Sequence, residues 1–360
     1  MVFVTEDVRI EADIFDELAE VCSSPGYVHA IAYLCFRDNT IKYSDKVTTD
    51  AVLQQFSMDR LVRTEISTLI GLTCKTKIDL SLPSPDVIQK YIDKTDGLLK
   101  EIHQSMMVSP SSLFDPDKIG DNTFNPFTNG DVLRETIFYG GEAAYHFQYR
   151  DLSKEKYKKD NDWFVEKRGF SIQQAIDDVT SIQTIQGEKI NDVMEGLVDK
   201  DPSEWSFLPA YTFSLEEVSN IANIDTAIAK SVVDSFVAPV DMASFGALDD
   251  FNPINAYPII KVTDNEYLLF QHYSLVEALY ETPFFWFNSD DEYKQNAMRH
   301  RGEFTEEFSA DRLKLVFGEK RVFSNIDIYD SKNIRAGEID VLVVFANRAI
   351  ILQAKSKNLL

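Results

Sequence analysis

The stretch Gly337–Lys357, GEIDVLVVFANRAIILQAKSK, decides the interpretation of the C-terminal part of this chain. It contains two apolar runs separated by Ala346-Asn347, and a two-residue turn that includes asparagine is typical of a β-hairpin. A turn at these two residues sets which positions of the two strands face each other, because each step back along the first strand is matched by one step forward along the second. Asp340 therefore lies opposite Gln353. The stretch therefore predicts two adjacent antiparallel strands.

Polar side chains gather at one end of the predicted hairpin. The same register pairs Glu338 with Lys355, and because side chains alternate between faces, both pairs lie on one face. An ordinary sheet accounts for them as a cross-strand ion pair and a hydrogen-bonded Asp340–Gln353 pair. Alternatively, the oxygens of Asp340 and Gln353 are ligands for Mg²⁺, with Mn²⁺ as a substitute, and Lys355 holds the attacking water or a phosphate.

The elements before the hairpin complete a recognisable order. Residues 301–318 have the pattern of a helix that ends at Gly318, and residues 321–330 form a further apolar strand. This order of one helix and three strands resembles that of the PD-(D/E)XK nuclease superfamily. The resemblance includes Asp on the second strand and Gln-x-Lys on the third. The motifs GEIDVLVV and ILQAKSK are most similar to Mrr-type restriction endonucleases and nuclease-related (NERD) domains. The resemblance covers residues 298–360.

This resemblance implies an α+β protein with a restriction-endonuclease-like core, and an enzyme. Its function would be metal-dependent hydrolysis of phosphodiesters, in the first place as a DNA endonuclease in restriction or phage defence. In that family the core continues beyond the lysine strand with a helix and a strand. We therefore expect the sequence to be part of a longer polypeptide, and expect this part by itself to lack activity if the rest is required.

In that family a helix glutamate completes the metal site. Among the helix acids we favour Glu307 as the third metal ligand, because Phe304, Phe308 and Ala310 would pack that helix face on the sheet. The other helix acids are explained by the favourable interaction of carboxylates with a helix N-terminus.

Basic side chains near the predicted site are candidate phosphate contacts. Arg335 and Lys357 are the two that we select, although a solvated surface charge explains each of them better.

The preceding residues predict two further segments. Residues 1–105 show apolar residues at three- and four-residue spacing, which predicts a helical N-terminal domain, and residues 106–297 are predicted to be mixed but mainly helical. Residues 214–236 have the spacing of a helix-turn-helix. Their single basic residue, Lys230, lies among acidic residues. Two packed helices therefore explain the pattern better than a DNA-binding helix-turn-helix does.

Charge separates the C-terminal segment from the rest of the chain. The net charge is −23, yet residues 298–360 contain eleven Lys and Arg against nine Asp and Glu, which leaves −25 for the remainder. Three cysteines without metal-binding spacing, and the lack of a long apolar run, favour a cytoplasmic protein without a membrane partner. The expected partner is nucleic acid, mainly DNA. The alternative is a non-catalytic nuclease-like scaffold whose acidic body binds a protein partner.

Overall fold

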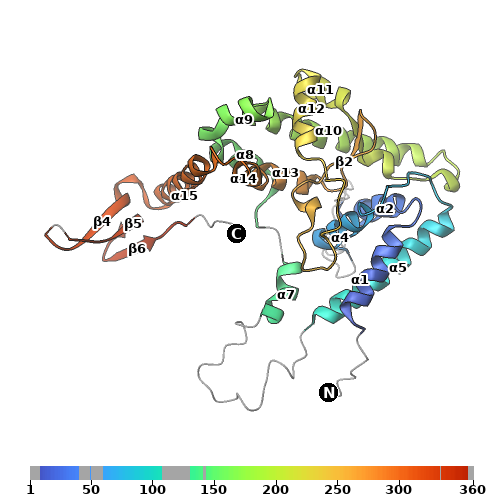
Figure 1. Ribbon diagram of the computed structural model, residues 1–360, viewed down its shortest axis with the longest axis horizontal. Coiled ribbons are helices and arrows are strands. Elements are labelled where there is room, and N and C mark those ends of the chain that lie inside the picture. Colours follow the sequence, from blue (N-terminus) through green and yellow to red (C-terminus); the bar gives the residue numbers. More distant parts are fainter. Residues whose placement is uncertain are drawn as a thin grey trace, which may run out of the picture. The chain divides into compact units, whose positions relative to one another are not determined.

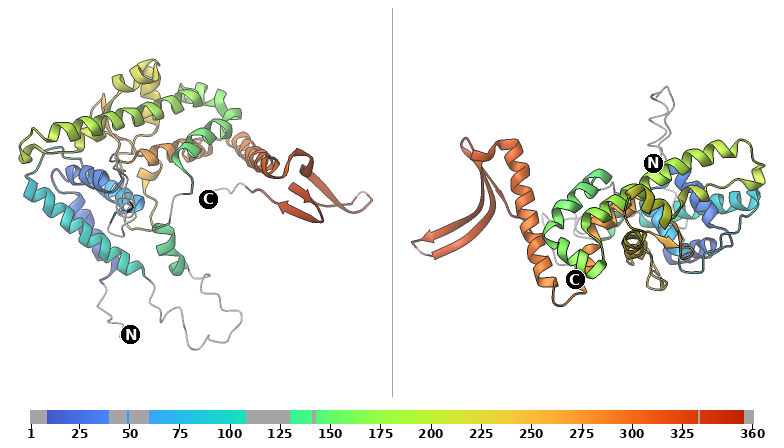
Figure 2. Two further views of the ribbon diagram at one scale, coloured as in Figure 1. Left: turned by 180° about the vertical axis from the view of Figure 1, so that it is seen from behind. Right: turned by 90° about the horizontal axis from the view of Figure 1, so that it is seen from above.

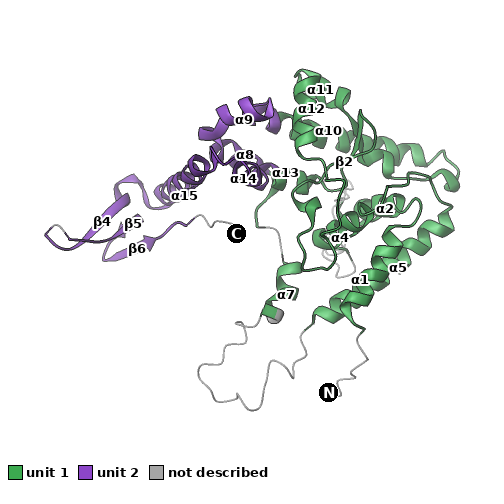
Figure 3. Ribbon diagram, in the orientation of Figure 1, with its two compact units in different colours: residues 1–146, 177–278 green, residues 147–176, 279–360 purple. Residues whose placement is uncertain are grey.

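The chain forms an α+β structure with two small antiparallel sheets of three strands, in the orders β1-β3-β2 and β4-β5-β6 (Figure 1). The computed structural model describes residues 9–39, 49, 60–107, 130–140, 143–332 and 334–355. The chain divides into two compact units, Met1–His146 with Asp177–Ala278, and Phe147–Ile176 with Leu279–Leu360 (Figure 3). Phe147–Ile176, which falls in the predicted segment 106–297, belongs to the same unit as the C-terminal segment.

The first unit is built around helices from the N-terminal part of the chain. Regular structure in the described part of residues 1–105 is helical, as predicted: α1 (Glu11–Cys22), α2 (Val28–Asn39), α4 (Arg63–Thr73) and α5 (Pro85–Met106). Helix α2 is buried along most of its length and packs against α4 and α5. Proline at the first position of α5 suits a helix start, because its missing N–H has no helical partner there.

The later elements of the first unit add helices and the smaller sheet. They are α7 (Gly130–Phe138), most of α10 (Ile172–Leu197), β1 (Thr212–Ser214), α11 (Leu215–Ala222), α12 (Thr226–Ser235), β2 (Ile260–Lys261), β3 (Glu266–Leu268) and most of α13 (His272–Glu281). The two helices predicted within residues 214–236 are present. They turn at Asn223, whose φ of 54° is left-handed.

The second unit contains the C-terminal segment of the chain. Its helices are α8 (His146–Lys156), the 3₁₀ turn η3 (Lys158–Asp160), α9 (Asn161–Arg168), α14 (Pro283–Asn288) and α15 (Lys294–Phe317). Its strands are β4 (Val322–Ser331), β5 (Ile334–Phe345) and β6 (Arg348–Leu352), all antiparallel. The predicted order of helix and three strands is therefore observed. Helix α15 starts seven residues earlier than the predicted start at Arg301.

Helix α15 covers one face of the β4-β5-β6 sheet (Figure 2). Its Ala310 is buried against Val341 and Val343 of β5. On the opposite face Val344 and Ile351 are 44% and 63% exposed. No helix in the described ranges combines the length and the apolar character that crossing a bilayer requires.

Candidate functional site

The β5–β6 hairpin has the register that the sequence predicts. Val341 pairs with Leu352 and Phe345 with Arg348 around a turn at Ala346-Asn347. The left-handed residue of this turn is Ala346, with a φ of 54°, and not the asparagine. Strand β6 ends one residue before Gln353, at the place where the polar residues begin.

Asp340 is the centre of the polar end of the hairpin. It is only 9% exposed, and its two carboxylate oxygens accept different hydrogen bonds. Gln353 Nε2 donates to Oδ1 over 2.8 Å, and the main-chain N–H of Ala354 donates to Oδ2 over 2.6 Å. The structure thus brings Asp340 and Gln353 together. The Gln353 amide uses its nitrogen in this contact, so its oxygen faces elsewhere.

The predicted cross-strand pair of Glu338 and Lys355 is not formed. Arg335 donates to Glu338 over 2.5 Å and to Asp327 on β4 over 2.7 Å, so its guanidinium neutralises two carboxylates of the sheet. Lys355 is exposed and has no ion pair with any other described residue. Arg335 is therefore engaged within the sheet and is a poor phosphate contact, whereas the ammonium of Lys355 remains available.

The helix glutamates separate onto different sides of α15. Glu307, the predicted ligand, accepts a hydrogen bond from Lys159 over 3.0 Å, and Glu303 accepts one from the same ammonium over 2.9 Å. Glu306 instead interacts with the sheet: its pKa is raised by partial burial and then by the negative charges of Asp340 and Glu338. Glu306, and not Glu307, is thus the helix glutamate within electrostatic range of Asp340.

Helix geometry explains this correction. Positions 306, 310, 313 and 317 follow one another at spacings of four, three and four residues, so they form one stripe along α15. Ala310, Leu313 and Phe317 of this stripe pack against the sheet. Phe304 and Phe308 belong to another stripe, where their rings stack on each other at 5.7 Å between centroids. Two apolar stripes exist, and of the three residues expected to face the sheet only Ala310 lies on the stripe that packs against it.

The other phosphate contact that the sequence predicts is Lys357. Lys357 lies outside the described residues. Arg321, a further basic residue near the sheet, donates to the carbonyl oxygen of Phe317 over 2.7 Å and lies over the ring of Phe345.

The donor atoms at this end of the hairpin suit a hard cation. Asp340 and Glu306 supply carboxylate oxygens and Gln353 supplies an amide oxygen, which are the ligands that Mg²⁺ prefers. Within the described ranges, no three His, Cys, Asp or Glu side chains are gathered closely enough to form a metal site as they stand. A bound cation would have to replace the hydrogen bond between Gln353 and Asp340.

Comparison with protein-family models, with curated proteins and with solved structures gives no significant match for this chain.

Proposed function

We propose that the end of the β5–β6 hairpin and the facing side of α15 form the active site of a Mg²⁺-dependent phosphodiesterase that acts on nucleic acid, with DNA as the first candidate. The observation that carries this proposal is the direct contact between Asp340 and Gln353, with Glu306 within electrostatic range. The exposed Lys355 follows two residues after Gln353. The resemblance to PD-(D/E)XK nucleases gives these residue types the same roles.

The residues divide the chemical task between them. Asp340, Glu306 and the oxygen of Gln353 would hold the cation. When bound, the cation would stabilise charge on the phosphate and lower the pKa of a water molecule. The hydrogen bond from Ala354 fixes the carboxylate of Asp340 against the main chain of the opposite strand. Lys355, a mobile point charge, would orient the water or bind the phosphate.

The alternative remains a nuclease-like scaffold without catalysis. It is favoured by the amide of Gln353 at a position where an acid would bind a cation more tightly, and by the net charge of −23, which repels a polyanion.

The deciding experiment combines a calorimetric Mn²⁺ titration with cleavage of supercoiled plasmid in Mg²⁺. Asp340→Asn should lose metal binding and cleavage, because it removes the central carboxylate. Lys355→Ala should retain metal binding and lose cleavage. Glu307→Gln is the matched control and should behave as the wild type does.

Two results would argue against the proposal. Unchanged cleavage by Asp340→Asn would refute the assignment of the site. Metal binding without cleavage of DNA or RNA by the wild type would favour the scaffold.

A further inference from the structure

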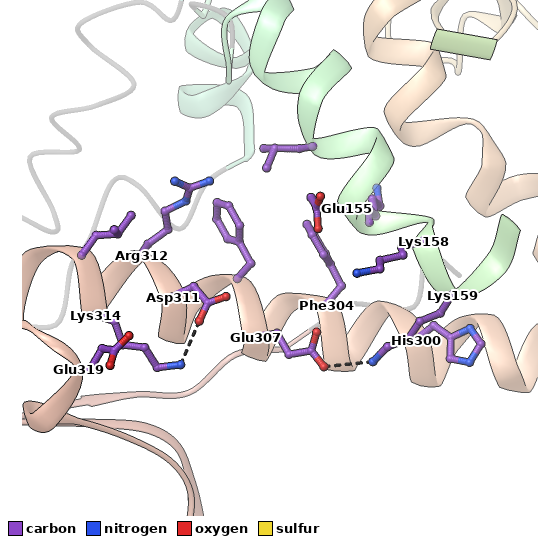
Figure 4. A pocket seen from close by; sticks show the side chains of 14 residues that line it. Glu155, Lys158, Lys159, His300, Phe304, Glu307, Asp311, Arg312, Lys314 and Glu319 are labelled. Carbon is purple, nitrogen blue, oxygen red and sulfur yellow. Dashed lines mark hydrogen bonds and ion pairs between the residues drawn. The ribbon is translucent and has the colours of Figure 1, made fainter. Parts of the chain in front are cut away.

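A second feature of the same unit is a groove on the other side of α15. Its volume is about 620 Å³, within the range of small-molecule sites, and it lies between α15 and residues 152–159 of α8 and η3. Figure 4 shows side chains of the two segments pointing toward one another across it, with Lys158 and Glu155 on one side and Phe304 and Arg312 on the other. Glu307 belongs to this groove, and Glu306 does not.

One end of the groove is basic, and hydrogen bonds hold one of its side chains in a fixed orientation. Lys158 and Lys159 line it together with His300 of α15. Asp160, buried at 2% exposure, accepts hydrogen bonds of 2.7 Å from both His300 Nδ1 and the hydroxyl of Tyr293. Because an ionised carboxylate only accepts, Nδ1 carries the proton in this contact, and the ring of His300 is held in one orientation.

The middle of the groove is aromatic. Phe304 and Phe308 stack with an interplanar angle of 28°, and the guanidinium of Arg312 lies 4.9 Å from the centre of the Phe308 ring. Both rings are only partly buried, so they form a wall against which a planar group can pack.

The charges of the groove are mixed. Five cationic and four carboxylate side chains line it, in a chain whose net charge is −23. Two of the carboxylates are neutralised by neighbours, Glu307 by Lys159 and Asp311 by Lys314. Lys158 has no ion pair with any residue in the described ranges, and is therefore free to meet an anion.

We propose that this groove binds a free nucleotide. The phosphate would contact Lys158 at the basic end near His300, the base would pack on Phe304 and Phe308, and carboxylates such as Glu155 would accept hydrogen bonds from ribose hydroxyls or base amino groups. A nucleotide offers an anion, a planar ring and hydrogen-bond donors together, which matches cations, rings and carboxylates in one cavity. A polynucleotide strand fits less well, because the two lining carboxylates without an ion pair among the described residues, Glu155 and Glu319, and the net charge of −23 would repel its successive phosphates.

The test is calorimetric titration of the protein with AMP, GMP, CMP and UMP, and with inorganic phosphate, adenosine and a short single-stranded deoxyoligonucleotide as comparisons. At least one monophosphate should bind, and inorganic phosphate and adenosine should bind about tenfold more weakly or not at all. Lys158→Ala and Phe308→Ala should each weaken nucleotide binding about tenfold, because they remove a charge-assisted contact and a stacking surface. Lys154→Ala, an exposed lysine of α8 outside the groove, should have no effect.

Circular dichroism establishes that each variant is folded, and Arg312→Ala replaces Phe308→Ala if the latter is not. The proposal is overturned if no nucleotide binds, if both groove variants bind as the wild type does, or if the oligonucleotide binds more tightly than every mononucleotide. Asp340→Asn should leave nucleotide binding intact. The proposal for this groove and the proposal for the phosphodiesterase site are therefore tested independently.

Discussion

Replacing Lys156 by methionine tests the electrostatics of the groove wall. Lys156 is 6% exposed, its ammonium donates to the carbonyl oxygen of Tyr280 over 2.8 Å, and it lies 3.5 Å from the centre of the Tyr280 ring. Its carboxylate neighbour, Glu281, is 3.5 Å away and half exposed. The pKa of Lys156 is lowered to about 8, mainly by burial; the carboxylate of Glu281 opposes this shift, and the positive charge of Arg301 contributes to it.

The size and the sign of the expected change in folding free energy follow from the pKa of Lys156. A decrease from 10.5 to about 8 corresponds to about 3 kcal/mol of folding free energy that the charged lysine costs. Below pH 8 both the folded and the unfolded state are protonated, so the full cost is present. Between pH 8 and 10.5 the unfolded state retains a proton that the folded state has released, and stability therefore rises with pH. The advantage of Lys156→Met over the wild type should accordingly shrink by about 3 kcal/mol across this interval.

The assay is urea unfolding of both proteins between about pH 7 and 10.5, followed by tryptophan fluorescence. In a Trp205→Phe background the only remaining tryptophans are Trp163 and Trp286. Both belong to the second unit, so their fluorescence reports the unfolding of that unit. Other lysines and tyrosines titrate in both proteins and cancel in the difference. Lys154→Met, at an exposed position of the same helix, should give a difference that does not vary with pH. A flat difference for Lys156→Met as well would refute the reasoning.

Three further perturbations have defined outcomes. Asp178 is fully buried with no hydrogen-bond partner for its carboxylate oxygens among the described residues, and burial followed by the charge of Asp177 raises its pKa to about 7. Since the raised pKa makes wild-type stability fall as pH rises from about 4 to 7, the stability of Asp178→Leu relative to wild type should increase by about 4 kcal/mol over that interval in urea unfolding. Ala346→Gly should stabilise the hairpin by about 1 kcal/mol, because its φ of 54° is unfavourable for alanine, and Asn347→Gly should give no such gain. Glu306→Gln should weaken Mn²⁺ binding about tenfold in calorimetry while Glu307→Gln leaves it unchanged, and equal effects would contradict the assignment of the two sides of α15.

The hairpin and its register were predictable because they depend on local rules. A two-residue turn fixes the pairing, and strict alternation then decides which side chains share a face. The same rules identified β4 and the end of α15 at Gly318, where a left-handed φ of 86° ends the helix. They did not predict which residue of the turn is left-handed, because asparagine is the favoured choice and Ala346 takes that position instead.

The groove and the correct helix acid depend on contacts that a local pattern does not contain. Asp160 and His300 are 140 residues apart in the sequence, so no spacing rule connects them. Helix α15 has one apolar stripe through Phe304 and Phe308 and another through Ala310 and Phe317. Periodicity shows that both exist, but only the packing of the sheet decides which stripe it covers. Glu306 and Glu307 are adjacent in the sequence, and the tertiary structure assigns them to different sites.

The electrostatics around Glu306 bear on the choice between catalyst and scaffold. Asp340, Glu338 and Glu306 place negative charges near one another, and Arg335 neutralises only the side of Glu338 and Asp327. The pKa of Glu306 is raised first by partial burial and then by this repulsion. A scaffold gains nothing from such a cluster, since replacing Glu306 by glutamine would remove the repulsion and leave the packing of Ala310 and Phe317 against the sheet in place. A divalent cation would convert the same repulsion into attraction. Glu306→Gln should therefore raise stability in the absence of metal, and lower the extra stability that Mn²⁺ confers. Thermal unfolding with and without Mn²⁺ measures both effects, and a destabilised variant with an unchanged response to Mn²⁺ would contradict a role of Glu306 in binding the cation.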